Sequence, residues 1–179
     1  ALAQEADAET AERGVVAYGI AQAAEMLSGR YDLVTTNVPY LGRGKQVRSL
    51  KKFLEQHYSR SKRDLATSFI ERCMHLGSSD GTSVAVVTPQ SWFFQVSYSD
   101  LRKSILKQRK ARLISSLGKN AFDSIGGEVV NVALSVIDVS TPSRDHRLSL
   151  IDVSNAENPK DKALRLEAQG IIRLGQSEL

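Results

Sequence analysis

The stretch YDLVTTNVPYLGRGK, residues 31–45, constrains the fold more than any other part of the chain. Its first seven residues are rich in β-branched side chains, which is typical of a short strand. Asn37, Pro39 and Tyr40 close that strand. Pro39 has no backbone N–H and keeps Val38 extended, so the chain does not continue into a helix at this point. The stretch therefore predicts a strand that ends abruptly in an amide, a proline and an aromatic ring.

Strand and helix patterns alternate on both sides of this stretch. Further strands are predicted at 83–89, 112–118, 126–139 and 146–153, and helices at 3–28, 47–57, 64–76 and 98–109. Asp64 or Ser61 is expected to cap the helix at 64–76. Strands that alternate with helices predict an α/β fold with a mostly parallel sheet. The consecutive strands near the end of the chain predict an antiparallel end strand, with 146–153 at the edge. The polar tail after it is expected to be helical near 162–168 and otherwise free of the sheet.

The end of the first strand offers groups that suit a planar ligand. In open α/β sheets, ligands bind at the carboxyl ends of the strands, where Asn37 to Tyr40 lie. The Asn37 side chain and the Val38 carbonyl can both accept hydrogen bonds, so an exocyclic amino group fits between them. Tyr40 supplies a flat face for a ring. A plain strand-ending turn is the alternative, because Asn-x-Pro is favourable turn chemistry.

Positive charge is concentrated in two segments. The chain carries a net charge of +4, but residues 43–63 alone have eight basic residues and one acid, and residues 100–112 have six basic residues and one acid. These balances of +7 and +5 leave about −8 for the rest of the chain. Two such segments predict surfaces that face a polyanion, with solvated helix faces as the alternative.

Other features narrow the class of protein. Cys73 is the one cysteine, which excludes a disulfide within the chain and fits a reducing, cytoplasmic setting, and it is expected to be buried. No run approaches the length of a membrane span, so no membrane partner is predicted. His57, His75 and His146 have no ligand spacing, so the sequence predicts no metal site.

Several segments in order resemble one enzyme family. YDLVTTNVPY (31–40) resembles the Asn-Pro-Pro-Tyr motif of S-adenosylmethionine-dependent, N6-adenine-specific DNA methyltransferases. The matching segments that follow are SKRDLATSFIERC (61–73), GTSVAVVTPQSW (81–92), LGKNAFDSIGGEVVNVALSVI (117–137) and LIDVSNAEN (150–158). The likeness covers roughly residues 20–160. It is closest to the adenine methyltransferases of BREX phage defence (PglX) and to fused type II restriction-methylation enzymes.

The resemblance implies a role for each matching residue. A target adenine would be flipped out of the duplex, and its N6 amino group would donate hydrogen bonds to the Asn37 side chain and the Val38 carbonyl. Tyr40 would stack on the base, and Phe122 would pack against it from a later loop. The methyl donor would be S-adenosylmethionine. Double-stranded DNA would be the partner, with other defence proteins as further partners. Residues expected to contact DNA phosphates are Arg43, Lys45, Arg48, Lys51 and Lys52.

The chain departs from the family pattern at two points. Val38 stands where the family usually has proline, although the role there belongs to a backbone carbonyl that Pro39 still restrains. The cofactor-binding glycine motif of the family is expected upstream of Ala1, so no cofactor-binding residue is assigned. Residues 1–155 are therefore expected to be the carboxyl-side part of a catalytic domain that is inactive alone. Residues 156–179 are expected to be a polar, partly helical tail that leads to a downstream region.

Two other functions stay open. The first is an enzyme of the same fold that methylates RNA or protein; the basic insert after Tyr40 and the later motifs argue against protein glutamine. The second is a module that binds DNA or a partner and has lost its catalytic activity. The presence of Val38 where the family usually has proline suggests this alternative.

Overall fold

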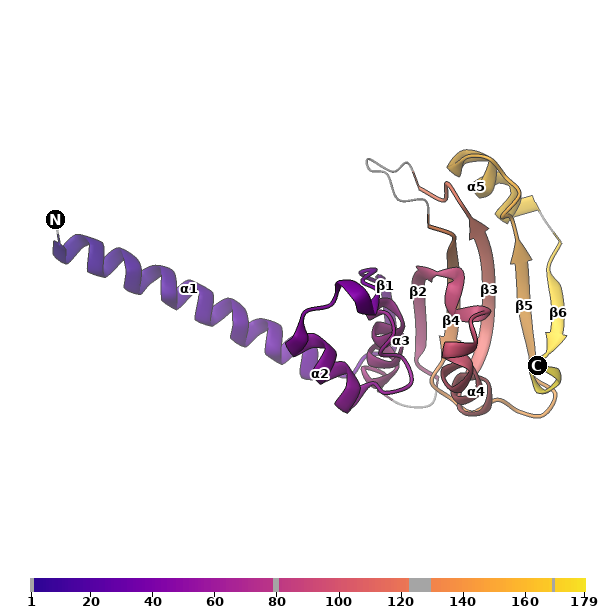
Figure 1. Cartoon of the computed structure of the whole chain (residues 1–179), viewed down its shortest axis with the longest axis horizontal. Helices are drawn as coiled ribbons and strands as arrows, with labels where there is room; N and C mark the ends of the chain where they lie inside the picture. Colours follow the sequence, from indigo (N-terminus) through magenta and orange to yellow (C-terminus); the bar gives the residue numbers. More distant parts are fainter. Residues whose placement is uncertain (1, 79–80, 123–129, 169) are drawn as a thin grey trace.

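The computed structural model describes residues 2–78, 81–122, 130–168 and 170–179. Within them lies a sheet of six strands in the order β1-β2-β4-β3-β5-β6 (Figure 1). The strands are β1 (Leu33–Asn37), β2 (Ser83–Pro89), β3 (Lys110–Gly118), β4 (Val132–Asp138), β5 (Arg147–Asp152) and β6 (Ile172–Gly175). The α-helices are α1 (Leu2–Ser28), α2 (Arg48–His57), α3 (Leu65–His75), α4 (Ser99–Gln108) and α5 (Pro159–Ala168).

The strand directions confirm an α/β sheet that runs mostly one way. β1 pairs in parallel with β2, and β3 pairs in parallel with β5. β4 is antiparallel to both β2 and β3, so β1, β2, β3 and β5 share one direction. β6 is antiparallel to β5 and forms one edge. The carboxyl ends of the four like-directed strands therefore lie at the same end of the sheet. This end runs across all the strands, is distinct from the edge strands, and is called the carboxyl edge.

Two details of the predicted sheet are wrong. The antiparallel strand from the 126–139 segment lies inside the sheet, and β5 pairs with β3 instead of forming the edge. Residues 172–175, expected to be free of the sheet, form the antiparallel edge strand β6. These pairings join segments that are far apart in the sequence. The burial of whole strands determines which strands pair, so local sequence patterns do not predict the pairing. Residues 126–129 of the predicted strand lie outside the described residues.

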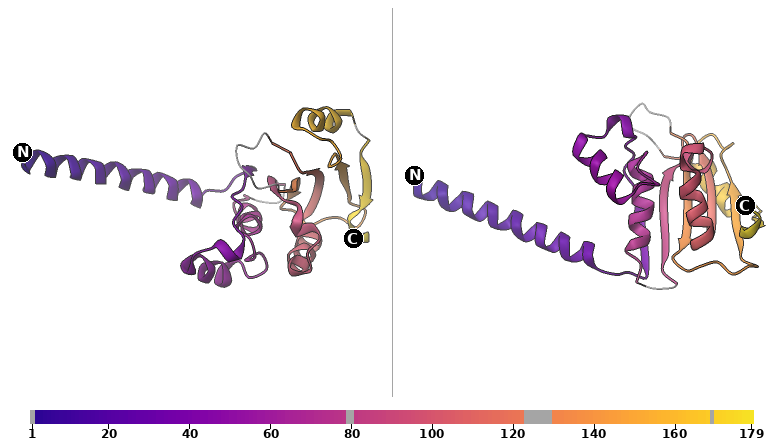
Figure 2. Two further views of the ribbon diagram at one scale, coloured as in Figure 1. Left: turned by 45° about the horizontal axis from the view of Figure 1, so that its top comes forward. Right: turned by 60° about the horizontal axis from the view of Figure 1, so that its bottom comes forward.

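One face of the sheet is covered by α3 and α4. Side chains along β2 alternate in burial, because successive residues of a strand point to opposite faces. Val84 and Val86 belong to one core with buried residues of α3 and α4. Figure 2 shows these two helices on the same face of the sheet. The buried members of this first core are Val38, Ala66, Ile70, Cys73, Met74, Val84, Val86, Trp92, Tyr98, Leu101, Ile105 and Ile137. Cys73 is buried as predicted, and burial raises the pKa of its thiol.

The opposite face is covered only in part. Leu117, Val132 and Val153 form a second core there, and Leu166 of α5 packs against it. Over β1, β2 and β4 this face is open, and a shallow hollow is lined by residues that include Asn37 and Leu134. The face that carries Asn37 is therefore accessible, whereas the face behind it is filled.

The long helix α1 stands apart from the sheet. In Figure 1 it extends away from the other elements, and its apolar side chains such as Tyr18 and Ile20 are exposed. It ends at Ser28, as predicted, and Gly29 follows, where a Cβ would lie 2.9 Å from the Tyr31 hydroxyl. The Arg72 guanidinium of α3 donates to the Leu27 carbonyl at 2.6 Å and so ties the end of α1 to α3.

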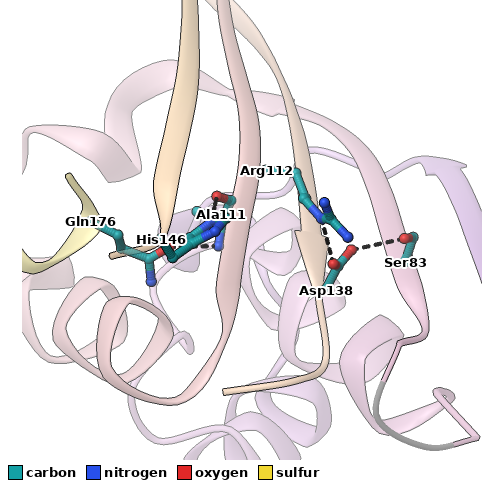
Figure 3. Close-up of polar contacts among 6 residues, drawn as sticks. All are labelled: Ser83, Ala111, Arg112, Asp138, His146 and Gln176. Carbon is teal, nitrogen blue, oxygen red and sulfur yellow. Dashed lines mark hydrogen bonds and ion pairs between the residues drawn. The ribbon is translucent and has the colours of Figure 1, made fainter. Parts of the chain in front are cut away.

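Polar contacts fasten the amino-terminal ends of the parallel strands (Figure 3). The carboxylate of Asp138, only 2% exposed, accepts a hydrogen bond from the Ser83 hydroxyl at 2.8 Å and pairs with the Arg112 guanidinium at 2.6 Å. Gln176 follows β6 and accepts a hydrogen bond from the Ala111 N–H at 2.9 Å. Its amide also donates to the Leu106 and Arg109 carbonyls at 2.8 and 2.7 Å. The segment after β6 is therefore held against β3 and the end of α4.

Arg112→Met should lower the free energy of unfolding by about 2 kcal/mol, because it leaves the buried Asp138 carboxylate without its cation. The effect is smaller than for a fully buried pair, since the Arg112 side chain is 58% exposed. Chemical denaturation measures it, with Lys103→Met on the exposed face of α4 as the control. Equal stability of the two variants would show that water, rather than Arg112, stabilises Asp138.

Candidate active site at the carboxyl edge of the sheet

Four loops of interest leave the sheet at the carboxyl edge. β1 ends there at Asn37, β2 at Pro89, β3 at Gly118 and β5 at Asp152. The antiparallel β4 starts at the same edge, because Val132 pairs with both Pro89 and Gly118. The sheet thus gathers the segments that carry Asn37 to Tyr40 and Phe122, which lie far apart in the sequence, along one line.

The side chains of Asn37 and Val38, at the end of β1, lie on opposite faces of the sheet. Asn37 is exposed on the open face, and among the described residues its side-chain amide has no hydrogen-bond partner. Val38 is 3% exposed, packs in the first core, and donates its N–H to the Val87 carbonyl at 3.4 Å. Val38 therefore anchors the segment, and the Asn37 amide is left available to a ligand. The buried side chain of Val38 was not foreseen from the sequence.

An open pocket of about 410 Å³ lies beside Tyr40. Its lining consists of Tyr40, Gly42, Arg43, Gly44, Lys45, Asp64, Pro89 and Val130. The Tyr40 ring is 36% exposed, and burial together with the nearby Asp64 carboxylate raises the pKa of its hydroxyl. The phenol therefore stays neutral at physiological pH and can present a flat, uncharged face to a planar ring. Asn37 lies on the neighbouring hollow of the open face and does not line this pocket.

Asp64 organises this pocket, and the sequence revealed only half of its role. It caps α3 as predicted, because its carboxylate accepts a hydrogen bond from the Ala66 N–H at 2.8 Å. The same oxygen also accepts from the Leu41 N–H at 3.3 Å. Asp64 thus ties the residue after Tyr40 to the start of α3. No local pattern signals this second bond, because the two partners are 23 positions apart.

The predicted phosphate-contacting residues fall into two groups. Arg43 and Lys45 lie in the 3-10 turn η1 (Arg43–Lys45) and line the pocket beside Tyr40. The Arg43 guanidinium pairs with Glu55 of α2 and so holds the turn against that helix. Arg48, Lys51 and Lys52 follow on α2, with Arg48 and Lys52 exposed and Lys51 half-buried. The structure therefore brings only Arg43 and Lys45 to the pocket and places the other three along the adjoining helix.

Phe122 leaves the sheet at the same edge but farther along it. Strand spacing of about 4.8 Å puts the end of β3 roughly 14 Å from the end of β1, with β2 and β4 between them. Tyr40 comes three residues after β1 and Phe122 four residues after β3. Phe122 does not line the pocket beside Tyr40. Phe122 is 50% exposed, and residues 123–129 after it lie outside the described residues.

One known protein family matches most of this chain. Residues 3–122 match the family described as Eco57I restriction-modification methylase. This chain belongs to that family. The methylase match covers nearly all of α1, the segment from Asn37 to Tyr40, the pocket lining except Val130, and the loop up to Phe122. It confirms the resemblance to adenine methyltransferases of restriction-modification and phage-defence systems.

Two curated relatives of this methylase chain are adenine-specific methyltransferases. The chain is 38% identical over 111 residues to PglX of Lacticaseibacillus casei (strain Zhang), which covers 62% of the chain and 9% of that protein. It is 35% identical over 136 residues to BrxX of Escherichia coli O9:H4 (strain HS), which covers 76% of the chain and 11% of that protein. The chain therefore spans about a tenth of the length of these relatives.

Solved structures with the same fold include a DNA complex. A chain of the DrdV–DNA complex has the same fold, with a TM-score of 0.62 and 16% sequence identity. The match covers 87% of this chain and 18% of that chain. A putative class I S-adenosylmethionine-dependent methyltransferase from Listeria monocytogenes matches 79% of this chain and 42% of its own with a TM-score of 0.54 and 18% identity. At these identities the likeness confirms the predicted fold.

None of the described helices is both long enough and apolar enough to cross a membrane. Within 2–78, 81–122, 130–168 and 170–179, no group of three or more His, Cys, Asp or Glu side chains could hold a metal ion.

Proposed function

We propose that this chain forms part of the catalytic domain of an enzyme that transfers a methyl group to N6 of adenine in DNA, in restriction-modification or phage defence. The observation that carries the proposal is the segment from Asn37 to Tyr40 at the carboxyl end of a parallel strand, beside a pocket with basic lining. The curated relatives PglX and BrxX, which are adenine-specific methyltransferases, support the choice of base.

In this proposal the residues after β1 hold the target amino group. The Asn37 side-chain carbonyl and the Val38 carbonyl accept the two N6 hydrogens, which increases electron density on N6. The two acceptors would orient the N6 lone pair for attack on the methyl group that the donor would supply, and N6 would lose one proton to water on transfer. Tyr40 stacks on the flipped adenine, and Phe122 packs against it from the β3 loop. The position of the Val38 carbonyl is fixed because Val38 is anchored in the core.

S-adenosylmethionine is the proposed methyl donor and would supply an electrophilic methyl on a sulfonium. The residues present fit the acceptor base better than the donor. Before β1 the chain forms the helix α1 instead of a strand with a glycine-rich turn. The described residues therefore assign no pocket to the donor, and the Asn37-to-Tyr40 segment is assigned only to the base.

Double-stranded DNA is the proposed macromolecular partner. Arg43 and Lys45 at the pocket and the three basic residues of α2 would contact phosphates beside the flipped base. The DrdV–DNA complex, which has the same fold, supports this choice. Because the proposed target is DNA inside the cell, the cytoplasm is the proposed location, and further defence proteins are proposed partners.

The burial of Val38 argues against the alternative of a binding module that has lost its catalytic activity. Val38 replaces the usual proline, but its side chain is 3% exposed and fills the first core. The substitution therefore has a packing explanation, and the carbonyl that the chemistry needs is still present. RNA or protein as the target is tested directly below.

Transfer to each kind of target tests the proposal. The protein from the complete gene is incubated with S-adenosylmethionine and with DNA, RNA or protein, and mass spectrometry then quantifies methylated nucleosides and methylglutamine. We expect N6-methyladenine in DNA and no product in the other two. Methylated RNA or methylglutamine without N6-methyladenine in DNA would replace the proposed target.

Charge reversal of Lys51 and Lys52 to Glu should weaken DNA binding for all sequences alike. The slope of log affinity against log salt should fall by about 2, because each phosphate contact releases about 0.9 counterions. The control is the double variant Lys160→Glu and Arg165→Glu on α5, whose side chains are exposed. Binding isotherms between low and physiological salt measure the slope. An unchanged slope would make the α2 lysines an ordinary solvated face.

A further inference from the structure

The end of β3 rests on a turn with no assigned role. The 153–157 turn follows β5 and is closed by a hydrogen bond from the Ala156 N–H to the Val153 carbonyl at 3.1 Å. Val153 and Ala156 are only 1% and 5% exposed. The Val153 N–H also donates to the Ser116 carbonyl of β3 at 2.9 Å. The turn is therefore fixed beside the carboxyl edge, with Val153 and Ala156 buried.

A buried lysine holds this turn in place. Lys162 of α5 is 2% exposed, and its ammonium donates to the Ala156 carbonyl at 2.5 Å and to the Val153 carbonyl at 3.3 Å. Burial and the nearby Arg165 lower the pKa of Lys162, and Asp152 opposes them. A buried ammonium is stable only where it is well hydrogen-bonded, so these two bonds fix the turn relative to α5.

The chain that leaves β3 is fastened to this turn. Gly118 has a φ of +68°, and a Cβ there would lie 2.9 Å from Cβ of Ser154. Asn120 has a φ of 54°, and its amide donates to the Glu157 carbonyl at 3.3 Å. Ala121 packs against the second core. Phe122, the next residue, projects with half of its surface exposed.

We infer that the 153–157 turn is the platform that sets the position of the Phe122 ring, and that Lys162 and Asn120 are positioning residues for it. The inference rests on the proposed packing of Phe122 against the target base. Only Ala121 separates the Asn120 anchor from the ring, so a shift of the turn moves the ring with it. A displacement of about 1 Å at a reacting centre can cost about 10²-fold in rate.

Cleavage by chymotrypsin tests the platform without any assay of activity. The protein from its complete gene is digested briefly, and mass spectrometry compares cleavage after Phe122 with cleavage after Tyr98. Tyr98 is 4% exposed in the first core, so cleavage there requires unfolding and serves as the internal reference for global unfolding. Lys162→Met should raise the ratio about tenfold, because proteolysis follows the population of the released loop. Lys160→Met, an exposed lysine of the same helix, should leave it unchanged.

Two substitutions at Asn120 keep the test decisive if Lys162→Met does not fold. Asn120→Gly keeps the left-handed backbone but loses the bond to Glu157, whereas Asn120→Ala loses both. The ratio should therefore rise in the order wild type, Gly variant, Ala variant. Equal ratios in the wild type, Lys162→Met and Asn120→Ala would overturn the platform.

Methylation kinetics then test whether the platform acts through Phe122. Phe122→Ala and Lys162→Met should each lower kcat/KM for DNA about tenfold, and the double variant should lose no more than either single variant. If the loss of kcat/KM in the double variant is the product of the two single losses, Lys162 acts through general stability. If Lys162→Met loses no kcat/KM, Lys162 has no positioning role. If the wild type transfers no methyl group, the proposed function fails, while the cleavage ratios still decide the platform.

Discussion

Asn37→Ala should abolish methyl transfer while the protein stays folded. The loss is expected to be at least about 10²–10³-fold, because the substitution removes an oriented hydrogen-bond partner of the reacting nitrogen. The folded state should be little affected, since Asn37 is exposed and, among the described residues, its amide has no hydrogen-bond partner. Incorporation of labelled methyl groups into DNA measures the rate, and thermal unfolding measures the fold.

Two matched variants define the effect of Asn37→Ala. Thr35→Ala changes the exposed residue two positions earlier on the same face of β1 and should leave transfer unchanged. Asn37→Asp keeps an acceptor oxygen at the same place and should retain more activity than the alanine variant. Normal transfer by Asn37→Ala would show that Asn37 is only the end of a strand.

Gly118→Ala should lower the free energy of unfolding by about 3 kcal/mol. An alanine at a φ of +68° costs about 1–2 kcal/mol, and the added Cβ would lie 2.9–3.0 Å from Ser154 atoms, including its backbone, which adds about 1–3 kcal/mol of overpacking. Because β3 and the 153–157 turn are pressed together here, neither side can move away easily. Denaturant or thermal unfolding of the purified variant measures the loss.

Gly44→Ala is the matched control for this prediction. Gly44 lies in the η1 turn, and a Cβ there would meet nothing within 4 Å. Its substitution should change the free energy of unfolding by less than about 0.5 kcal/mol. If Gly118→Ala is as stable as Gly44→Ala, the close packing of β3 on the turn is not present in solution.

Local sequence patterns predicted the elements well where a signal was local. β2 matches the predicted strand at 83–89, and Asp64 caps α3 as expected. The pairing of the strands was not contained in such patterns. Residues 139–146 make a short link between β4 and β5, which favours neighbouring strands, yet β5 pairs with β3. That choice depends on burying β3 between two partners, which is a property of the whole sheet.

The candidate site was predicted only in part, because local patterns again do not show contacts between distant residues. The segment from Asn37 to Tyr40 was found because proline, amide and ring are adjacent in the sequence. The burial of Val38, the bond from Leu41 to Asp64 and the ammonium of Lys162 join residues that local patterns do not connect. The assignment of Asn37, Tyr40, Phe122 and the basic residues to adenine and DNA remains a prediction that only chemistry can decide.

The most direct measurement is the amount of N6-methyladenine in genomic DNA. Three strains are compared: one with the complete gene, one without it, and one with Asn37→Ala, all with neighbouring genes intact. We expect methylation at one sequence motif in the first strain and none at that motif in the other two. Equal methylation in all three strains, or methylation that survives Asn37→Ala, would exclude the chemistry proposed for the segment from Asn37 to Tyr40.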